Sequence, residues 1–140
     1  EQVLKYEKWA DLIGLKGVTN EGESYGNKFD SYITEKLTVD RLKGAGASFD
    51  ALLNRQGDYL IIGLYPGTME ARKRNIMSKL EFLPQPLVVA NMYIAFSKKS
   101  KCYESLKEGF SAAITQARSS GKVKRLLIDG DKKFNSNVVN

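Results

Sequence analysis

The sequence predicts an α/β fold in which a mostly parallel sheet is flanked by helices. Three observations predict this class. Segments of strand length alternate along the chain with segments of helical spacing. The segment Asp58–Leu64 (DYLIIGL) is almost continuously apolar, as is typical of a strand covered on both faces. The length of 140 residues is enough for one domain of ordinary size and too small for two.

The first half of the chain contains most of the alternation. Trp9–Gly17 is predicted to form a short helical turn, capped by Asp11 and ending at glycine, before a strand that begins at Val18-Thr19. Ser48 is a favourable N-cap after a glycine- and alanine-rich loop. The elements expected from here to the apolar strand are a helix from Asn27 to about Leu37, a strand over Thr38–Leu42, a loop over Gly44–Ala47 and a helix from Ser48 to Gly57.

The second half of the chain is predicted to end in helices. A helix is expected to begin at Pro66 and to run through Met69–Leu80, and Leu87–Ser97 is expected to form one long strand or two strands joined by a bend. The remaining expectations are a helix after Lys101 that ends at Gly121 with Leu106, Phe110, Ile114 and Ala117 on one face, a helical turn over Val123–Ile128, and a frayed polar tail over Asp129–Asn140.

Composition argues against several classes of function. The chain has no histidine and one cysteine, Cys102, which removes most transition-metal sites and every triad that needs a histidine base. We therefore expect a protein that is not an enzyme and that holds no metal and no cofactor. The net charge is +6, but the basic residues occur in ones, twos and threes without a one-sided stripe, so we expect solvated surface charge and no nucleic-acid partner.

The apolar runs are short. The longest, such as Tyr59–Leu64, are far below the roughly 20 residues that a membrane-spanning helix needs, so no span is expected. The first nine residues, EQVLKYEKW, lack the apolar centre of a signal peptide.

The segment from Gly22 to Gly26 (GESYG) forms a strand–turn–helix junction with a serine at its corner. One interpretation is that Gly22 sets a turn and that Ser24 or Asn27 caps the following helix. The other is that the free N–H groups at the start of the helix, with the Ser24 hydroxyl, hold a carboxylate or phosphate group of a ligand. The residues alone leave both interpretations open.

Three longer segments resemble a known family. They are WADLIGLKGVTNEGESYG, DALLNRQGDYLIIG and PLVVANMYIAFSKKSKCYESLKEGF, which occur in this order at suitable separations. Together they resemble the C-terminal part of extracytoplasmic (periplasmic) solute-binding proteins of the amino-acid ABC transporter type. The resemblance covers roughly residues 9 to 128. It implies that the α/β fold is one lobe of a type II periplasmic-binding-protein-like fold, with a first lobe that precedes these residues.

The resemblance also implies an organisation and a function. Residues 1–93 would form the second lobe, with the hinge crossing near Val88–Tyr93. Residues 94–140 would form a return segment that packs on the first lobe or exchanges with a second copy in a domain-swapped homodimer. The protein would bind a small anionic or amino-acid-like solute without catalysis, in a periplasmic or other extracytoplasmic location, and deliver it to a membrane permease. The alternative is a ligand-sensing effector domain of a transcription regulator, which shares this architecture.

The candidate ligand-binding residues lie on two loops. By resemblance, Gly22, Glu23, Ser24 and Tyr25 form the turn that contacts the carboxylate of the ligand. Gly63 lies near the end of the predicted apolar strand, and Tyr65 follows that strand. Members that bind α-amino acids have an aspartate for the ammonium group where this chain has Gly63. Because a buried ammonium without a counter-charge is costly, three alternatives remain: a ligand without an ammonium, a charge supplied by Glu23, or loss of binding.

Overall fold

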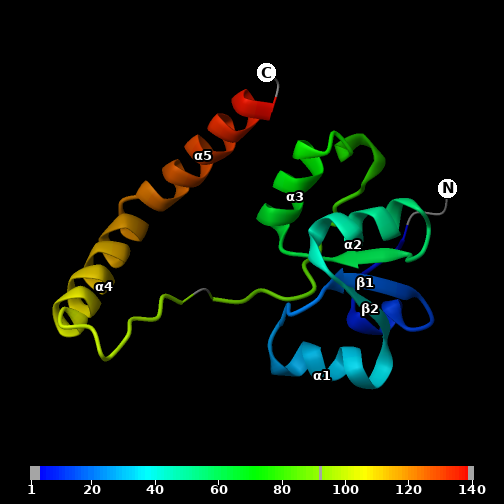
Figure 1. The fold of residues 1–140 in the computed structure, drawn as a ribbon, viewed down its shortest axis with the longest axis horizontal. Coiled ribbons are helices and arrows are strands. Elements are labelled where there is room, and N and C mark those ends of the chain that lie inside the picture. Colours follow the sequence, from blue (N-terminus) through cyan, green and yellow to red (C-terminus); the bar gives the residue numbers. More distant parts are fainter. Residues whose placement is uncertain (1–3, 92, 139–140) are drawn as a thin grey trace. The chain divides into compact units, whose positions relative to one another are not determined.

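A computed structural model describes residues 4–91 and 93–138 of the chain. The chain divides into two compact units, Glu1–Ala90 and Asn91–Asn140. We call them the sheet unit and the helical unit, and we describe each by itself (Figure 1).

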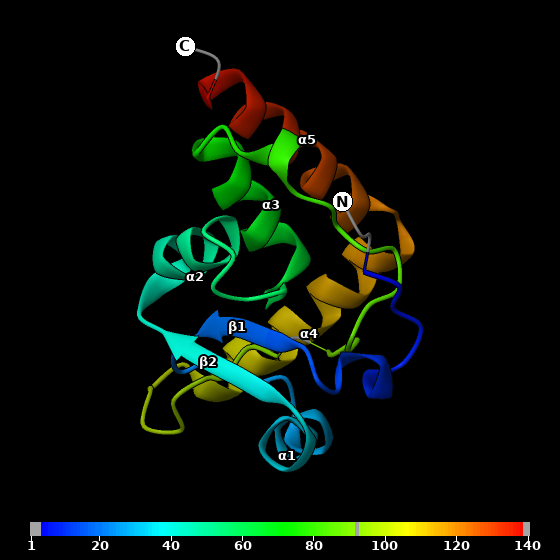
Figure 2. The same ribbon diagram turned by 90° about the vertical axis from the view of Figure 1, so that its right-hand side faces the viewer.

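The sheet unit is built on three parallel strands in the order β2-β1-β3. Their bounds are Lys16–Asn20 for β1, Thr38–Leu42 for β2 and Tyr59–Ile61 for β3. The central strand β1 pairs with both neighbours, so Gly17 lies between Val39 and Tyr59. Figure 2 shows β1 and β2 side by side and running in the same direction. The predicted α/β class with a parallel sheet flanked by helices is therefore confirmed.

Helices cover both faces of this sheet. Helix α1 (Asn27–Lys36) lies on one face, and α2 (Gly44–Leu53) and α3 (Leu64–Lys73) lie on the other (Figure 1). Alternate side chains of β3 lie on opposite faces of the sheet, because successive side chains of a strand point in opposite directions. Two apolar clusters result, one of Leu12, Phe29, Ile33, Tyr59 and Ile61, and one of Phe49, Ala71 and Ile76 with the adjoining Leu60.

Gly17 in the central strand leaves room for the ring of Tyr59. A Cβ atom at this position would lie 2.6 Å from the Tyr59 ring carbons. Such an approach is shorter than any tolerable contact, so the first apolar cluster requires a glycine here.

Several predicted elements are confirmed. A 3-10 turn spans Trp9–Leu12, and the Asp11 carboxylate caps it by accepting the backbone N–H groups of Glu7 and Lys8 at 2.9 and 3.0 Å. These hydrogen bonds lower the pKa of Asp11. The turn ends at Leu12 instead of at a glycine, and β1 begins at Lys16, two residues before the expected Val18. The α1 helix and the β2 strand have the bounds expected from their apolar spacing to within one residue.

The predicted start of α2 is wrong. The helix begins at Gly44, so the expected Gly44–Ala47 loop is its first turn, and it ends at Leu53 before the predicted Gly57. Ser48 is wholly buried and donates its hydroxyl proton to Asn20 Oδ1 at 2.8 Å instead of capping a helix. Helix α2 contacts β1, and the alanines of this turn favour a helix, which offsets the low helix propensity of Gly44 and Gly46.

The boundaries around β3 and α3 also differ from the prediction. The strand ends at Ile61, and α3 begins at Leu64, two residues before Pro66. It ends at Lys73 because Asn75 adopts a positive φ of 55°, which no right-handed helix accommodates. Met77–Lys79 then forms a separate 3-10 turn.

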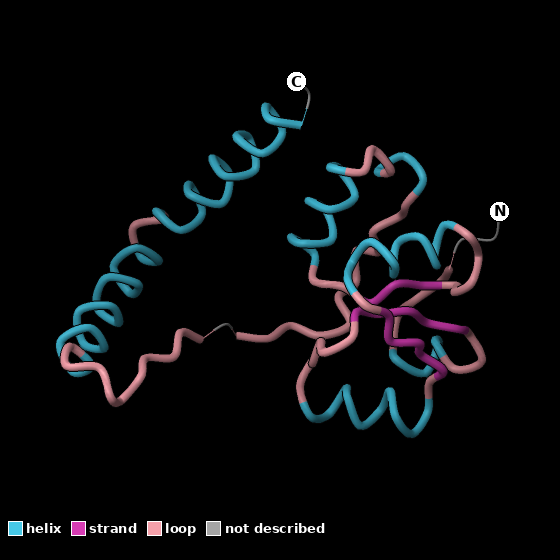
Figure 3. The backbone as a smooth tube through the Cα atoms, in the orientation of Figure 1, coloured by secondary structure: helices cyan, strands magenta, loops and turns pink. Residues whose placement is uncertain are grey.

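The predicted strand over Leu87–Ser97 is wrong for the described residues. They contain neither helix nor strand between Leu80 and Cys102 (Figure 3). Leu87 and Val88 pack against the first apolar cluster, whereas Val89 is 85% exposed. A strand is stable only when its N–H and C=O groups pair with a neighbouring strand, and the described residues pair none with this segment.

The helical unit contains α4 (Tyr103–Ser119) and α5 (Lys122–Val138), which contact each other. The helix predicted after Lys101 is confirmed. The predicted short turn and frayed tail are wrong as far as Val138, because α5 is one continuous helix; residues 139–140 lie outside the described residues. Lysine and arginine are good helix formers, and apolar residues at helical spacing extend across this stretch. Gly121, with φ of 70°, separates the two helices.

Candidate functional site

The predicted ligand-binding residues lie in two neighbouring segments of the sheet unit, which we call the two loops, although the second extends into the first turn of α3. Gly22–Tyr25 follows β1, and Gly63–Tyr65 follows β3, which is paired with β1. The chain then continues into α1 on one face of the sheet and into α3 on the other (Figure 1). In parallel α/β sheets, adjacent strands whose connections leave toward opposite faces open a crevice beyond their carboxyl ends. The candidate residues from both loops lie at this point of the topology.

Tyr25 joins the two loops. Its hydroxyl oxygen lies 3.0 Å from the carbonyl oxygen of Ile61, the last residue of β3. The buried Thr19 hydroxyl lies 3.0 Å from the same carbonyl and also forms a hydrogen bond with the Tyr25 hydroxyl. Burial raises the pKa of Tyr25, so its hydroxyl keeps its proton and can donate. The turn after β1 is thereby attached to the end of β3.

The turn itself needs glycine at two positions. Gly22 and Gly26 have φ values of 81° and 94°, which favour glycine strongly. Arg41, at the end of β2, donates from Nη1 to the carbonyl oxygen of Glu23 at 2.7 Å and holds the turn from the other side. Sequence reasoning missed Arg41. Arg41 could have been found from the pairing of β1 with β2, because this pairing places Arg41 opposite Thr19.

Asp30 occupies the donors that the resemblance assigns to a ligand. Ser24 donates its hydroxyl proton to Asp30 Oδ2 at 2.6 Å, and the Tyr25 N–H donates to Oδ1 at 3.0 Å. These hydrogen bonds, that from Ser24 foremost, lower the pKa of Asp30. Sequence reasoning missed Asp30 as well, although an acid in the first turn of a helix is a known stabilising feature. The two donors are satisfied within the chain, and their contact with a ligand stays a prediction.

The second loop presents apolar surface. Leu64 and Tyr65 begin α3 with 62% and 64% of their area exposed, and Met69 one turn later is also exposed. Gly63 precedes them and closely approaches Pro66, since a Cβ there would lie 3.0 Å from the proline ring. The three exposed side chains form what we call the α3 patch.

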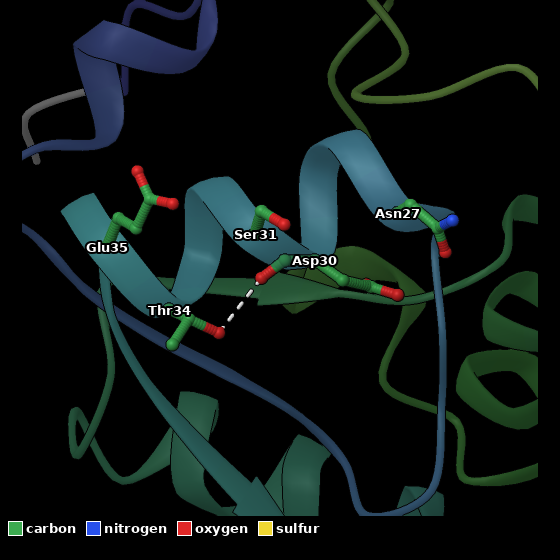
Figure 4. Close-up of a pocket in the computed structure, with 5 residues that line it drawn as sticks. All are labelled: Asn27, Asp30, Ser31, Thr34 and Glu35. Atoms are coloured by element: carbon green, nitrogen blue, oxygen red, sulfur yellow. Dashed lines mark hydrogen bonds between the residues drawn. The ribbon is translucent and has the colours of Figure 1, made fainter.

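The sheet unit has two surface hollows, of which the first reaches the turn after β1 through Asp30. One, of about 360 Å³, runs along the outer side of α1 and is drawn in Figure 4, lined by Asn27, Asp30, Ser31, Thr34 and Glu35. Its drawn side chains form one hydrogen bond, from the Thr34 hydroxyl to the Asp30 carbonyl oxygen. It includes none of the six predicted ligand-binding residues. The other hollow, of about 470 Å³, lies beside Trp9.

The described residues contain no group of three side chains suited to hold a metal ion, and none of their helices is long and apolar enough to cross a membrane. No family model, no curated protein and no solved structure matches the chain.

Proposed function

We propose that the sheet unit is the second lobe of a non-catalytic solute-binding protein and forms one wall of its ligand cleft. The observation that carries the proposal is the junction of two loops at the carboxyl ends of β1 and β3, held together by the Tyr25 hydroxyl on the Ile61 carbonyl. Ligands of parallel α/β sheets bind at such a point.

The surface around the junction supports a small polar solute with an apolar part. The α3 patch offers the exposed ring of Tyr65, which suits stacking or a hydrogen bond. Two charged side chains from other elements form hydrogen bonds with the turn after β1: the cationic Arg41 of β2 and the anionic Asp30 of α1. Opposite charges of this kind complement the carboxylate and the ammonium group of an amino-acid-like solute. Because Gly63 supplies no carboxylate for the ammonium group, Asp30 is a second candidate, besides Glu23, for this counter-charge.

A single wall makes only part of the contacts of a closed cleft. In the proposed protein, the solute bridges two lobes and shifts the equilibrium from an open to a closed form. A location outside the cytoplasm and delivery to a membrane permease follow from the resemblance and belong to the same proposal. We therefore expect the sheet unit to bind its solute weakly, with a Kd on the order of millimolar.

The test is a titration of the isotope-labelled chain followed by the backbone amide signals. The probes are L-glutamate, L-lysine, L-leucine and the ammonium-free dicarboxylate glutarate. We expect at least one probe to shift signals of residues 22–26 and 64–65 together, because Tyr25 couples the two loops. Tyr65→Ala should weaken that binding, whereas Thr34→Ala, on the hollow of α1, should leave it unchanged.

Two results would contradict the proposal. One is a set of shifts confined to Ser31, Thr34 and Glu35 of the hollow along α1, which would move the site away from the carboxyl edge. The other is the absence of any shift in residues 22–26 and 64–65 with all four probes at millimolar concentrations.

A further inference from the structure

The first helical turn of the sheet unit contacts the segment by which the chain leaves the unit. The indole N–H of Trp9 donates to the carbonyl oxygen of Leu87 at 2.8 Å, across a separation of 78 residues. Trp9 begins the first described turn of the unit, and Leu87 lies three residues before its end at Ala90. One side chain therefore connects this turn to the leaving segment.

The Trp9 ring is itself held by α1. Its centroid lies 4.8 Å from that of Phe29 and 5.3 Å from that of Tyr32, with tilted planes in both pairs. Phe29 in turn contacts the ring of Tyr25 edge-on at 6.2 Å. Aromatic pairs in such arrangements are favourable beyond their burial. Ring contacts thus run from the leaving segment at Leu87 to Tyr25 in the candidate site.

Besides the indole contact, the leaving segment is held by packing at Leu87 and Val88. Leu87 and Val88 are half-buried against the first apolar cluster, and Val89 is already exposed. No helix or strand includes these three residues. The hollow of about 470 Å³ beside Trp9 is lined by Tyr6, Pro86 and Leu87 among others, so the segment has space to move if the indole contact is lost.

We propose that Trp9 is a positioning residue. Its indole N–H holds Leu87, where the chain leaves the sheet unit, in a fixed position relative to α1 and to the turn that precedes α1. This contact acts at one end of the hinge of the two-lobed protein, and that part rests on the proposed function. The fixed position of Leu87 does not depend on the proposed function, because the hydrogen bond and the ring contacts lie within the sheet unit.

The test compares backbone order parameters of Leu87 and Val88 in the 140-residue chain and in Trp9→Phe, which keeps an aromatic ring and removes the N–H donor. In the original chain we expect values near 0.85, as for rigid backbone, and in Trp9→Phe values below about 0.6. Tyr32→Phe is the matched control, because it removes a hydroxyl from the same ring cluster and leaves the indole bond intact. Its order parameters should equal those of the original chain.

Rigid Leu87 and Val88 in Trp9→Phe would overturn the proposal, because packing alone would then hold the segment. Equal mobility of the segment in both variants would also overturn it, because the effect would then not be specific to the indole N–H.

If Trp9→Phe does not fold, the original chain still gives a decision. Trp9 is its single tryptophan, so the indole proton gives one signal. That proton should exchange with water at least about tenfold more slowly than a free indole, and exchange at the free rate would overturn the proposal. The solute titration reports on the carboxyl edge and this measurement on Leu87, so the two proposals fail separately.

Discussion

The sheet unit and the helical unit differ in burial and in charge. All buried residues among those described lie between Leu12 and Ile76 in the sheet unit, whereas the described side chains of the helical unit are all at least partly exposed. Residues 1–90 carry twelve basic and twelve acidic side chains, and residues 91–140 carry ten and four. The whole net charge of +6 therefore belongs to the helical unit.

This difference indicates which part of the chain can support a fold by itself. The sheet unit buries two apolar clusters, one on each face of its sheet. In the helical unit, Leu106, Phe110 and Ile114 form an exposed stripe on α4, although Phe96 contacts Phe110 at 5.7 Å between ring centroids. Contact of this stripe with a first lobe, or with a second copy of the chain, stays a proposal.

The largest expected effect comes from emptying the core of the sheet unit. Phe49 on α2 is 1% exposed, so Phe49→Ala should lower the free energy of unfolding by about 3–5 kcal/mol through lost burial and a cavity. Phe110→Ala is the matched change in the helical unit, where the ring is 40% exposed, and should cost less than about 1 kcal/mol. Urea unfolding of both variants measures the comparison. Equal losses would mean that the helical unit has a core of its own.

A smaller effect is expected at the junction of the two loops. Thr19→Val removes a buried hydroxyl that contacts the Ile61 carbonyl and the Tyr25 hydroxyl, and should cost about 1–2 kcal/mol. The midpoint of urea unfolding measures this loss. An unchanged midpoint would show that Thr19 does not support the junction, and the attachment of the turn to β3 would then depend on Tyr25 alone.

The smallest effect concerns pH. The pKa of Asp30 is lowered below its ordinary value of 3.8 by hydrogen bonds from Ser24 and the Tyr25 N–H. A group whose pKa is lowered by folding stabilises the folded state above its unfolded pKa, and this stabilisation is lost as the pH falls through the folded pKa. Stability of the original chain should thus fall below about pH 4, and Asp30→Asn should show a weaker fall. Unfolding midpoints at several pH values test this, and identical pH profiles would contradict it.

The sequence could predict the elements whose signals are local. The spacing of Phe29, Tyr32 and Ile33 predicts α1, and the alternation of TVDRL predicts β2. The two candidate loops could also be located, because they follow strands that the apolar pattern identifies.

The predictions that failed concern features that depend on tertiary contacts. The first turn of α2 receives a tertiary contact, because Arg74 Nη1 donates to the Gly46 carbonyl oxygen. Leu87–Ser97 contains no strand in its described residues because no neighbour pairs with it. At the site, Asp30 and Arg41 were missed for the same reason. Their partners, Ser24 and the Glu23 carbonyl, are brought to them by the turn and by the strand register.

The most direct test of the account is the unfolding of a chain shortened to residues 1–90. The central claim is that the sheet unit contains the fold and the candidate site without the helical unit. We predict that the shortened chain unfolds cooperatively in urea with the midpoint of the whole chain, because every described buried residue is retained. Loss of cooperative unfolding, or a large drop in the midpoint, would contradict the claim and show that residues 91–140 are part of the same folding unit.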